Sequence, residues 1–333
     1  MVNITPFVPK HVPIDHPLVT KDYSLYTPSI GRMEEVISEW IDNQVDGGTI
    51  FGPSRFGKSS AVNNWLQSLL SERFGGFVPL VIWSHIDSGG GLSAARFYSQ
   101  ILEASRHHLA RAVRSPLDRQ HMLLERFTTL AMQSGGRFVV LVIDEAQGMT
   151  QREWLWLVQI HSQLDQRRVR LCVISIASLQ FFDEPVGLAL SGGAHVASRF
   201  MLVSSQFSGV KNSSELNFVI RSYDEGAFWP ENSKISFTQG VAPKAWDEGF
   251  RMSQISAHLW NALVDNLPRN YRGKIEFPMS TISTACRNIL LKTGGAENWK
   301  ATTNSESISK TIKNSSHESL MRIVGATAPL AKD

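Results

Sequence analysis

The segment Gly52-Pro53-Ser54-Arg55-Phe56-Gly57-Lys58-Ser59 could bind phosphate, because it matches the pattern G-x-x-x-x-G-K-[ST]. In a loop of this kind, backbone N–H groups converge on phosphate oxygens, and the dipole of the following helix adds positive potential. Lys58 is placed to reach the β- and γ-phosphates, and the Ser59 hydroxyl to hold Mg²⁺. The next residue, Ser60, belongs to the same candidate nucleotide-binding set. The alternative interpretation is a chance glycine turn with a surface lysine.

The residues on both sides of this loop favour the phosphate-binding interpretation. The apolar run 48–51 before it is readable as a strand. The segment 60–74 after it has helical spacing of its apolar residues, which are Val62, Trp65, Leu66, Leu69 and Leu70. A strand, a glycine-containing loop and a helix N-terminus in this order predict a nucleoside triphosphate site, with ATP and Mg²⁺ as the expected ligands.

An acidic pair, Asp144 and Glu145, ends the apolar run 138–145 and supplies a second half for this site. Asp144 is expected to hold the water shell of Mg²⁺ opposite Ser59. Glu145 is expected to orient and deprotonate the water that attacks the γ-phosphate, since phosphoryl transfer needs mainly positioning and charge neutralisation. The pair could instead cap the following helix. The adjacent glutamate favours hydrolysis by water over transfer to a bound acceptor, so we predict an ATPase with Lys58 and Glu145 as catalytic residues.

Residues at the ends of two predicted strands could sense the γ-phosphate or restrain the glutamate. The run 169–177 ends near Ser175 and Ser178, and either hydroxyl could bind the phosphate or the water, or only satisfy a nearby backbone group. At the end of the run 78–86, Ser84 or His85 could hold Glu145 in an inactive pose.

Two arginines are further candidates. Arg199 follows a glycine-containing loop, and in a ring or filament it would face the neighbouring subunit's nucleotide, where a guanidinium stabilises transition-state charge. The alternative for Arg199 is a surface salt bridge. Arg287 lies on a predicted helix and could contact the γ-phosphate from a lid, or be an ordinary exposed arginine.

Apolar runs alternate with helical patterns up to residue 208, which indicates an α/β fold with a parallel sheet between helix layers. The predicted strands are 48–51, 78–86, 138–145, 169–177 and 199–203, and the predicted helices are 33–41, 60–74, 92–113, 116–132 and 151–164. Ligands of such sheets bind at the carboxyl ends of the strands.

The sequence predicts that the chain is divided into four parts. Residues 1–30 are proline-rich and indicate an extended N-terminal arm, and residues 31–208 form the nucleotide-binding domain. Residues 209–297, with helical patterns at 212–223, 252–267 and 279–292, predict a small helical lid. Residues 298–333 are rich in Ser, Thr, Asn and Lys and predict a flexible tail.

The composition is that of an ordinary soluble protein. Of 333 residues, 42% are hydrophobic and 19% charged, and the net charge of +3 allows a nucleic-acid partner without requiring one. Cys172 and Cys286 lie in apolar stretches without metal-ligand or disulfide spacing, which indicates a reducing compartment. No signal peptide or run of the length needed to span a bilayer is recognisable, so we expect a cytoplasmic protein without a membrane partner.

The loop 52–59, the pair Asp144-Glu145 and Arg199-Phe200, followed by a helical lid, resemble an AAA+ ATPase of the initiator or loader type. More narrowly, the chain is similar to the TnsC family of ATP-dependent transposition regulators. The proline-rich arm, the sequence Ile143-Asp144-Glu145-Ala146-Gln147 and the short lid fit that family. The length and the tail suggest its branch in bacterial CRISPR-associated transposons. The serines at the expected sensor position depart from the family pattern, and this departure concerns the rate of hydrolysis rather than nucleotide binding.

The resemblance implies an ATP-dependent homo-oligomer, a ring or helical filament, that assembles around double-stranded DNA. It also implies a TniQ/TnsD-like target-selection partner and transposase subunits of the TnsA and TnsB kind. Basic residues lining the pore would follow phosphates without reading sequence, and the candidates are Arg96, Arg106, Arg111 and Arg114. For each of them, a solvated helix face is the alternative.

Other functions remain open at this stage. One is an ATP-dependent assembly scaffold with negligible hydrolysis, and another is a helicase-loader-like ATPase that acts on a replication protein. A small-molecule kinase fits least, because no acceptor lid is recognisable.

Overall fold

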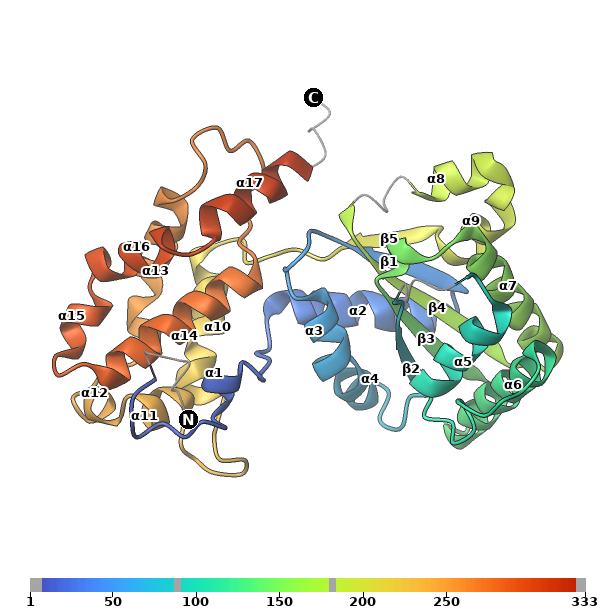
Figure 1. Cartoon of the computed structure of the whole chain (residues 1–333), viewed down its shortest axis with the longest axis horizontal. Helices are drawn as coiled ribbons and strands as arrows, with labels where there is room; N and C mark the ends of the chain where they lie inside the picture. The colour runs from blue at the N-terminus through green and yellow to red at the C-terminus, as the bar shows by residue number, and fades with distance from the viewer. Residues whose placement is uncertain (1–7, 87–90, 180–183, 328–333) are drawn as a thin grey trace. The chain divides into compact units, whose positions relative to one another are not determined.

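The computed structural model describes residues 8–86, 91–179 and 184–327, and the chain folds into two compact units (Figure 1). The first, which we call the sheet unit, comprises Ile30–Pro53 and Lys58–Phe207. The second, the helical unit, comprises the described residues up to Ser29, the segment Ser54–Gly57 and the chain from Ser208 onward. Among the helices of the described ranges, none combines the length and apolarity that crossing a bilayer requires.

The sheet unit contains a parallel sheet in the order β2-β3-β4-β1-β5. Its strands are β1 (Gly47–Phe51), β2 (Leu80–Ser84), β3 (Phe138–Asp144), β4 (Arg170–Ala177) and β5 (Val203–Gln206). The α/β prediction is therefore confirmed. Because β4 lies between β1 and β3, the phosphate-binding loop and the acidic pair follow strands that are not neighbours.

Helices cover both faces of this sheet, as the apolar runs predict. They are α2 (Pro28–Asp42), α3 (Lys58–Ala61) with a π-helical turn (Val62–Leu66) and α4 (Gln67–Arg73), α5 (Ala94–Ala104), α6 (Pro116–Gln133), α7 (Gln151–Gln166), α8 (Glu184–Leu188) and α9 (Ala194–Phe200). The two glycines that begin β1 identify the faces. A Cβ at Gly48 would lie 2.6 Å from the Trp40 ring of α2, and one at Gly47 would lie 2.8 Å from Phe200 of α9.

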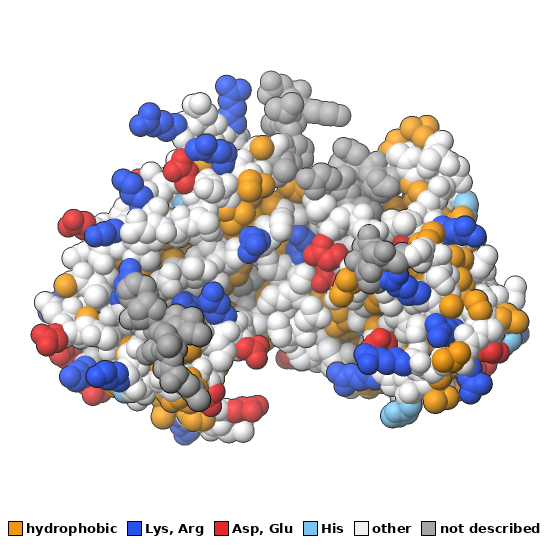
Figure 2. Space-filling view, viewed as in Figure 1, with side chains coloured by type: hydrophobic (Ala, Val, Ile, Leu, Met, Phe, Trp, Pro, Cys, Tyr) orange, Lys and Arg blue, Asp and Glu red, His pale blue; other side chains and the backbone are white. Residues whose placement is uncertain are grey.

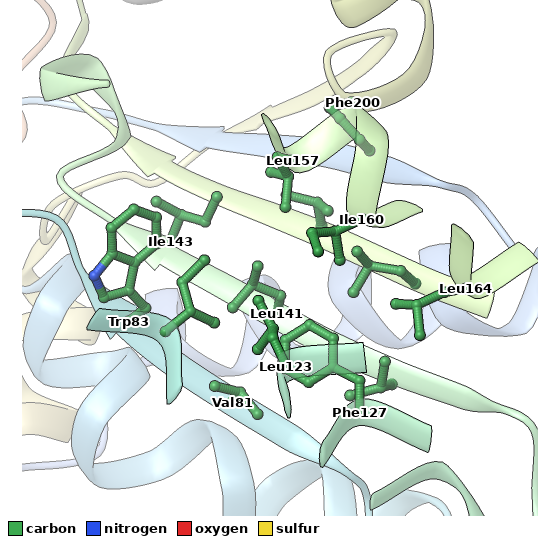
Figure 3. Packing of buried hydrophobic residues seen from close by; sticks show 14 of the residues in the cluster. Val81, Trp83, Leu123, Phe127, Leu141, Ile143, Leu157, Ile160, Leu164 and Phe200 are labelled. Carbon is green, nitrogen blue, oxygen red and sulfur yellow. The ribbon is translucent and has the colours of Figure 1, made fainter. Parts of the chain in front are cut away.

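A hydrophobic core of the sheet unit lies between the sheet and helices α5, α6, α7 and α9. Figure 3 shows Leu141 and Ile143 of β3 packed among side chains from these helices, including Phe127 of α6 and Leu157 of α7. The intervening residues of β3, Val140 and Val142, are fully buried too. Burial on both faces explains why this strand is apolar at every position before Asp144.

Two predicted elements of the sheet unit are wrong. The run 199–203 is not a strand, because Val196, Ala197 and Phe200 form the buried face of helix α9, and the strand begins only at Val203. The predicted helix 92–113 ends at Ala104, since Arg106 adopts a left-handed backbone conformation with φ 56°. Helix α6 then starts with a capping box between Ser115 and Asp118.

The helical unit has its own hydrophobic core. Its helices are α10 (Ser213–Glu225), α11 (Phe237–Val241), α12 (Pro243–Asp247), α13 (Ser256–Asp265), α14 (Met279–Gly295), α15 (Trp299–Thr303), α16 (Ser305–Lys313) and α17 (His317–Thr327). Leu216, Tyr223, Leu259, Ile282 and Ile289 are fully buried between them.

Both ends of the chain differ from the sequence-based expectation. Residues 299–327 form α15, α16 and α17, and Ile308, Ile312 and Met321 pack into the core of the helical unit, so this segment is not a flexible tail. The N-terminal segment is likewise docked. Leu18, in the short helix α1 (Pro17–Thr20), is fully buried, and the hydroxyls of Tyr23 and Tyr223 lie 3.0 Å apart.

Candidate nucleotide-binding site

The phosphate-binding loop connects β1 to α3, and its two glycines each have a steric reason. A Cβ at Gly52 would lie 2.5 Å from the carbonyl oxygen of Phe207, so no larger residue fits. Gly57 has φ +107°, a backbone conformation that L-residues rarely adopt. The central part of the loop packs within the helical unit. Phe56 is buried there, and the carbonyl of Arg55 accepts a hydrogen bond of 3.3 Å from the N–H of Ser280.

The Lys58 ammonium is held by the loop itself. Its Nζ donates to the carbonyl oxygens of Gly52, at 2.7 Å, and Pro53, at 2.9 Å. Burial lowers the pKa of Lys58 to about 8, although the nearby carboxylates of Glu145 and Asp144 favour the charged form. Without bound nucleotide, the positive charge of Lys58, which would contact a phosphate, is therefore only partly balanced by its neighbours.

The structure brings Ser59 and Asp144 together. Asp144 ends β3 with 4% of its surface exposed, and burial raises the pKa of its carboxyl while a hydrogen bond from Ser59 opposes the rise. Mg²⁺ in nucleotide sites usually takes one or two carboxylates together with phosphate oxygens. A hydroxyl and a buried carboxylate beside the loop fit that ion, and they are the residues that would hold it.

Glu145 projects from a sharp turn at the end of β3. Its backbone is left-handed, with φ 60° and ψ 38°, and leads into a 3₁₀ turn, Ala146–Gly148. Its side chain is exposed and accepts a hydrogen bond from the Gln147 amide. Gln147 Oε1 in turn accepts the N–H of Ser178, at 3.1 Å. No role in the site is predicted for Gln147 from the sequence. The feature of the sequence that could have indicated one is its position two residues after Glu145.

Of the residues proposed to restrain Glu145 or to sense phosphate, His85 and Ser175 have other surroundings, whereas Ser178 lies beside Gln147. His85 Nε2 is 3.2 Å from Oε1 of Glu153, in the first turn of α7, so it does not hold Glu145. Ser175 lies two residues before the end of β4, paired with Thr49 of β1, and it is fully buried. At Ser178 the backbone N–H makes the contact described above.

The two predicted arginines are both engaged with backbone carbonyls. Arg199 lies in α9, and its Nη1 donates to the carbonyl of His195 at 3.0 Å. Arg287 lies in α14, donates through Nε to the carbonyl of Leu18, and lies along a groove of about 770 Å³ in the helical unit together with Arg55.

The four arginines predicted to bind DNA do not share one helix face. Arg96 lies in the first turn of α5, whereas Arg106, Arg111 and Arg114 follow that helix in the connection to α6. Arg106 and Arg114 are exposed, and Arg111 is ion-paired with Glu103. In Figure 2, lysine and arginine side chains are spread over the visible face of each unit without forming one continuous stripe.

Comparison with known proteins supports the assignment of the fold. Residues 44–182, which include the phosphate-binding loop and the acidic pair, match the family model described as AAA domain. The chain has the AAA+ P-loop NTPase fold. Comparison with curated proteins gives no match.

Several solved structures of AAA+ proteins are similar to this one. The Aeropyrum pernix ORC2 protein, in ADPNP and ADP complexes, has a TM-score of 0.49 and 13% identity over 85% of this chain and 72% of that one. The Aeropyrum pernix ORC1 protein in complex with DNA has a TM-score of 0.45 and 17% identity, covering 75% and 63%. Drosophila ORC bound to DNA has a TM-score of 0.49 and 13% identity, covering 82% and 65%.

Proposed function

We propose that this AAA+ protein hydrolyses ATP and acts as an ATP-dependent, DNA-binding regulator of transposition. One observation carries the ATPase part of the proposal. Beside the loop that follows β1, the Ser59 hydroxyl is hydrogen-bonded to the Asp144 carboxylate, and the Lys58 ammonium interacts electrostatically with the carboxylates of Glu145 and Asp144. These are the cation, the hydroxyl and the two carboxylates that phosphoryl transfer to water requires.

In this mechanism, bound phosphates replace the carbonyl oxygens of Gly52 and Pro53 as partners of the Lys58 ammonium. The phosphate charge raises the lysine pKa again and keeps the side chain protonated. Glu145 orients the attacking water and accepts its proton as the water oxygen bonds to the γ-phosphorus, while the bond from this phosphorus to the oxygen bridging to the β-phosphate breaks and ADP leaves. Mg²⁺, held by Ser59 and Asp144, would neutralise charge on the phosphate oxygens.

The DNA and transposition part of the proposal rests on the resemblance to the TnsC family. The chain would assemble as a ring or helical filament on duplex DNA, and would join a TniQ/TnsD-like target-selection protein to TnsA- and TnsB-like transposase subunits. Arg96, Arg106, Arg111 and Arg114 are the proposed phosphate contacts, and Arg199 the group offered to a neighbouring subunit's nucleotide. Such a regulator would work in the bacterial cytoplasm, with Arg287 as a further candidate for γ-phosphate contact.

The first experiment is electron microscopy of the protein with a slowly hydrolysed ATP analogue, with and without duplex DNA. Rings or filaments that enclose DNA in the presence of the nucleotide, and that the Lys58→Ala variant does not form, are the expected result. Monomers that ignore DNA would overturn the DNA-binding proposal and favour an ATPase that acts on a protein partner, such as a helicase-loader-like protein.

A second experiment separates an ATP-driven regulator from a scaffold that only needs bound nucleotide. Glu145→Gln should keep nucleotide binding and lose about 100-fold or more in hydrolysis, since a general base contributes at least that factor. A regulator then remains locked on DNA, and its selection between targets is lost. Unchanged target selection with this variant would identify the chain as a scaffold.

A further inference from the structure

The Gln147 side chain connects Glu145 to the end of a different strand. Its Nε2 donates to Oε2 of Glu145, two residues earlier in the chain. Its Oε1 accepts the backbone N–H of Ser178, which directly follows β4, at 3.1 Å. One amide group therefore links the turn after β3 to the turn after β4.

The orientation of this amide follows from its partners. A backbone N–H can only donate, so the Gln147 oxygen must face Ser178. The NH₂ group then faces Glu145, whose ionised carboxylate can only accept. A flipped amide would set donor against donor on one side and acceptor against acceptor on the other, so the two contacts support each other.

The Glu145 backbone is restrained independently of this amide. Its carbonyl accepts the N–H of Gly148 at 2.9 Å, and its own N–H donates to Oδ1 of Asp144 at 3.1 Å. The exposed side chain of Glu145 is the part of this residue that can still change rotamer, and its hydrogen bond with the Gln147 amide restrains it.

We propose that Gln147 is a positioning residue, which holds the Glu145 carboxylate in place by an amide that Ser178 orients. The role rests on the proposed ATPase function, in which Glu145 activates the water. An exposed glutamate without this partner would occupy several rotamers, and only some of them would direct the carboxylate at the attacking water.

Three variants test the role, each measured for kcat, KM, ATP-analogue affinity and thermal unfolding. Gln147→Met keeps the approximate length and removes both polar contacts. Gln147→Glu keeps an acceptor for Ser178 and replaces the donor to Glu145 with a second negative charge. Gln151→Ala is the control, because that exposed glutamine makes its contact to the carbonyl of Ser191.

The expected result is a fall in kcat of about 10- to 100-fold for both Gln147 variants, with KM and analogue affinity within about threefold of wild type. Gln147→Glu should be at least as impaired as Gln147→Met. If Gln147 only anchored the two turns, Gln147→Glu would retain activity and Gln147→Met would lose thermal stability, and that outcome would overturn the proposal.

A double variant distinguishes this role from the proposed function. Adding Gln147→Met to Glu145→Gln should cost nothing further, because a positioning residue acts only through the group it positions. Wild-type ATPase activity that Glu145→Gln abolishes and that Gln147→Met leaves intact would refute the positioning role alone. Activity that Glu145→Gln leaves unchanged would refute the proposed role of Glu145, and the role of Gln147 with it.

Discussion

The lowered pKa of Lys58 predicts that ATP affinity falls when the pH is raised from 7 to 9. In the unliganded protein, burial lowers this pKa to about 8, and among the residues that the structure describes the ammonium donates hydrogen bonds to the carbonyls of Gly52 and Pro53. Bound triphosphate adds negative charge beside it and raises the pKa. Above pH 8 the free protein has largely lost this proton, so binding must take one up.

The size of the effect follows from the protonated fraction of Lys58. With a pKa of about 8, roughly nine-tenths of the lysine is charged at pH 7 and roughly one-tenth at pH 9. If only the ammonium form binds the phosphates well, Kd rises about ninefold, which corresponds to about 1.3 kcal/mol. The direction of the change in Kd is fixed by linkage: because binding takes up a proton, Kd rises as the pH rises.

Isothermal titration calorimetry with a slowly hydrolysed ATP analogue and Mg²⁺, in two buffers of different ionisation enthalpy, measures both affinity and proton uptake. At pH 9 the wild type should take up close to one proton, and at pH 7 close to none. Lys58→Met is the control, because any remaining pH dependence in that variant belongs to the nucleotide. Equal wild-type affinity at pH 7 and 9, without proton uptake, would refute the reasoning.

Three further predictions concern other parts of the chain. Ser175→Ala should leave ATPase activity unchanged and the free energy of unfolding equal or higher by up to about 1 kcal/mol, because the buried hydroxyl has no hydrogen-bond partner within residues 8–86, 91–179 and 184–327. A loss of turnover would restore Ser175 as a phosphate sensor. Ile312→Ala should lower the free energy of unfolding by about 2–5 kcal/mol, because the Ile312 side chain is buried, whereas Lys313→Ala at the exposed neighbouring position should have no effect. Equal denaturation curves for the two variants would mean that this segment is a flexible tail. Arg114→Ala should weaken duplex binding and reduce the dependence of log affinity on log salt concentration by about one unit. Arg111→Ala should have a smaller effect, because the Arg111 guanidinium is already ion-paired with Glu103. The reverse order would remove the connection between α5 and α6 from the proposed DNA interface.

The sequence by itself determined the class of fold and the position of the candidate phosphate-binding loop. The spacing of Gly52, Gly57, Lys58 and Ser59 is legible without a structure, because the loop's function depends on residues that are adjacent in the chain. The strand that ends at Asp144 was equally legible, since burial on both faces requires an apolar residue at every position.

Short amphipathic segments were not determined in this way. The run 199–203 satisfies the pattern of a buried strand, but Val196 and Phe200 lie four residues apart and face the core as one side of helix α9. Ile308 and Ile312 have the same spacing within a polar sequence. Two apolar residues are too few to identify a helix until a partner surface is known to bury them.

Only the tertiary structure decided which distant residues meet at the site. Strand order places β4 between β1 and β3, so the turn at Ser178 comes within reach of Gln147, 31 residues earlier. In the same fold, His85 is paired with Glu153, and Glu145 accepts its hydrogen bond from Gln147. Periodicity reports which face of an element is buried, whereas the choice of hydrogen-bond partner depends on strand order and on the helices between, which local sequence does not encode.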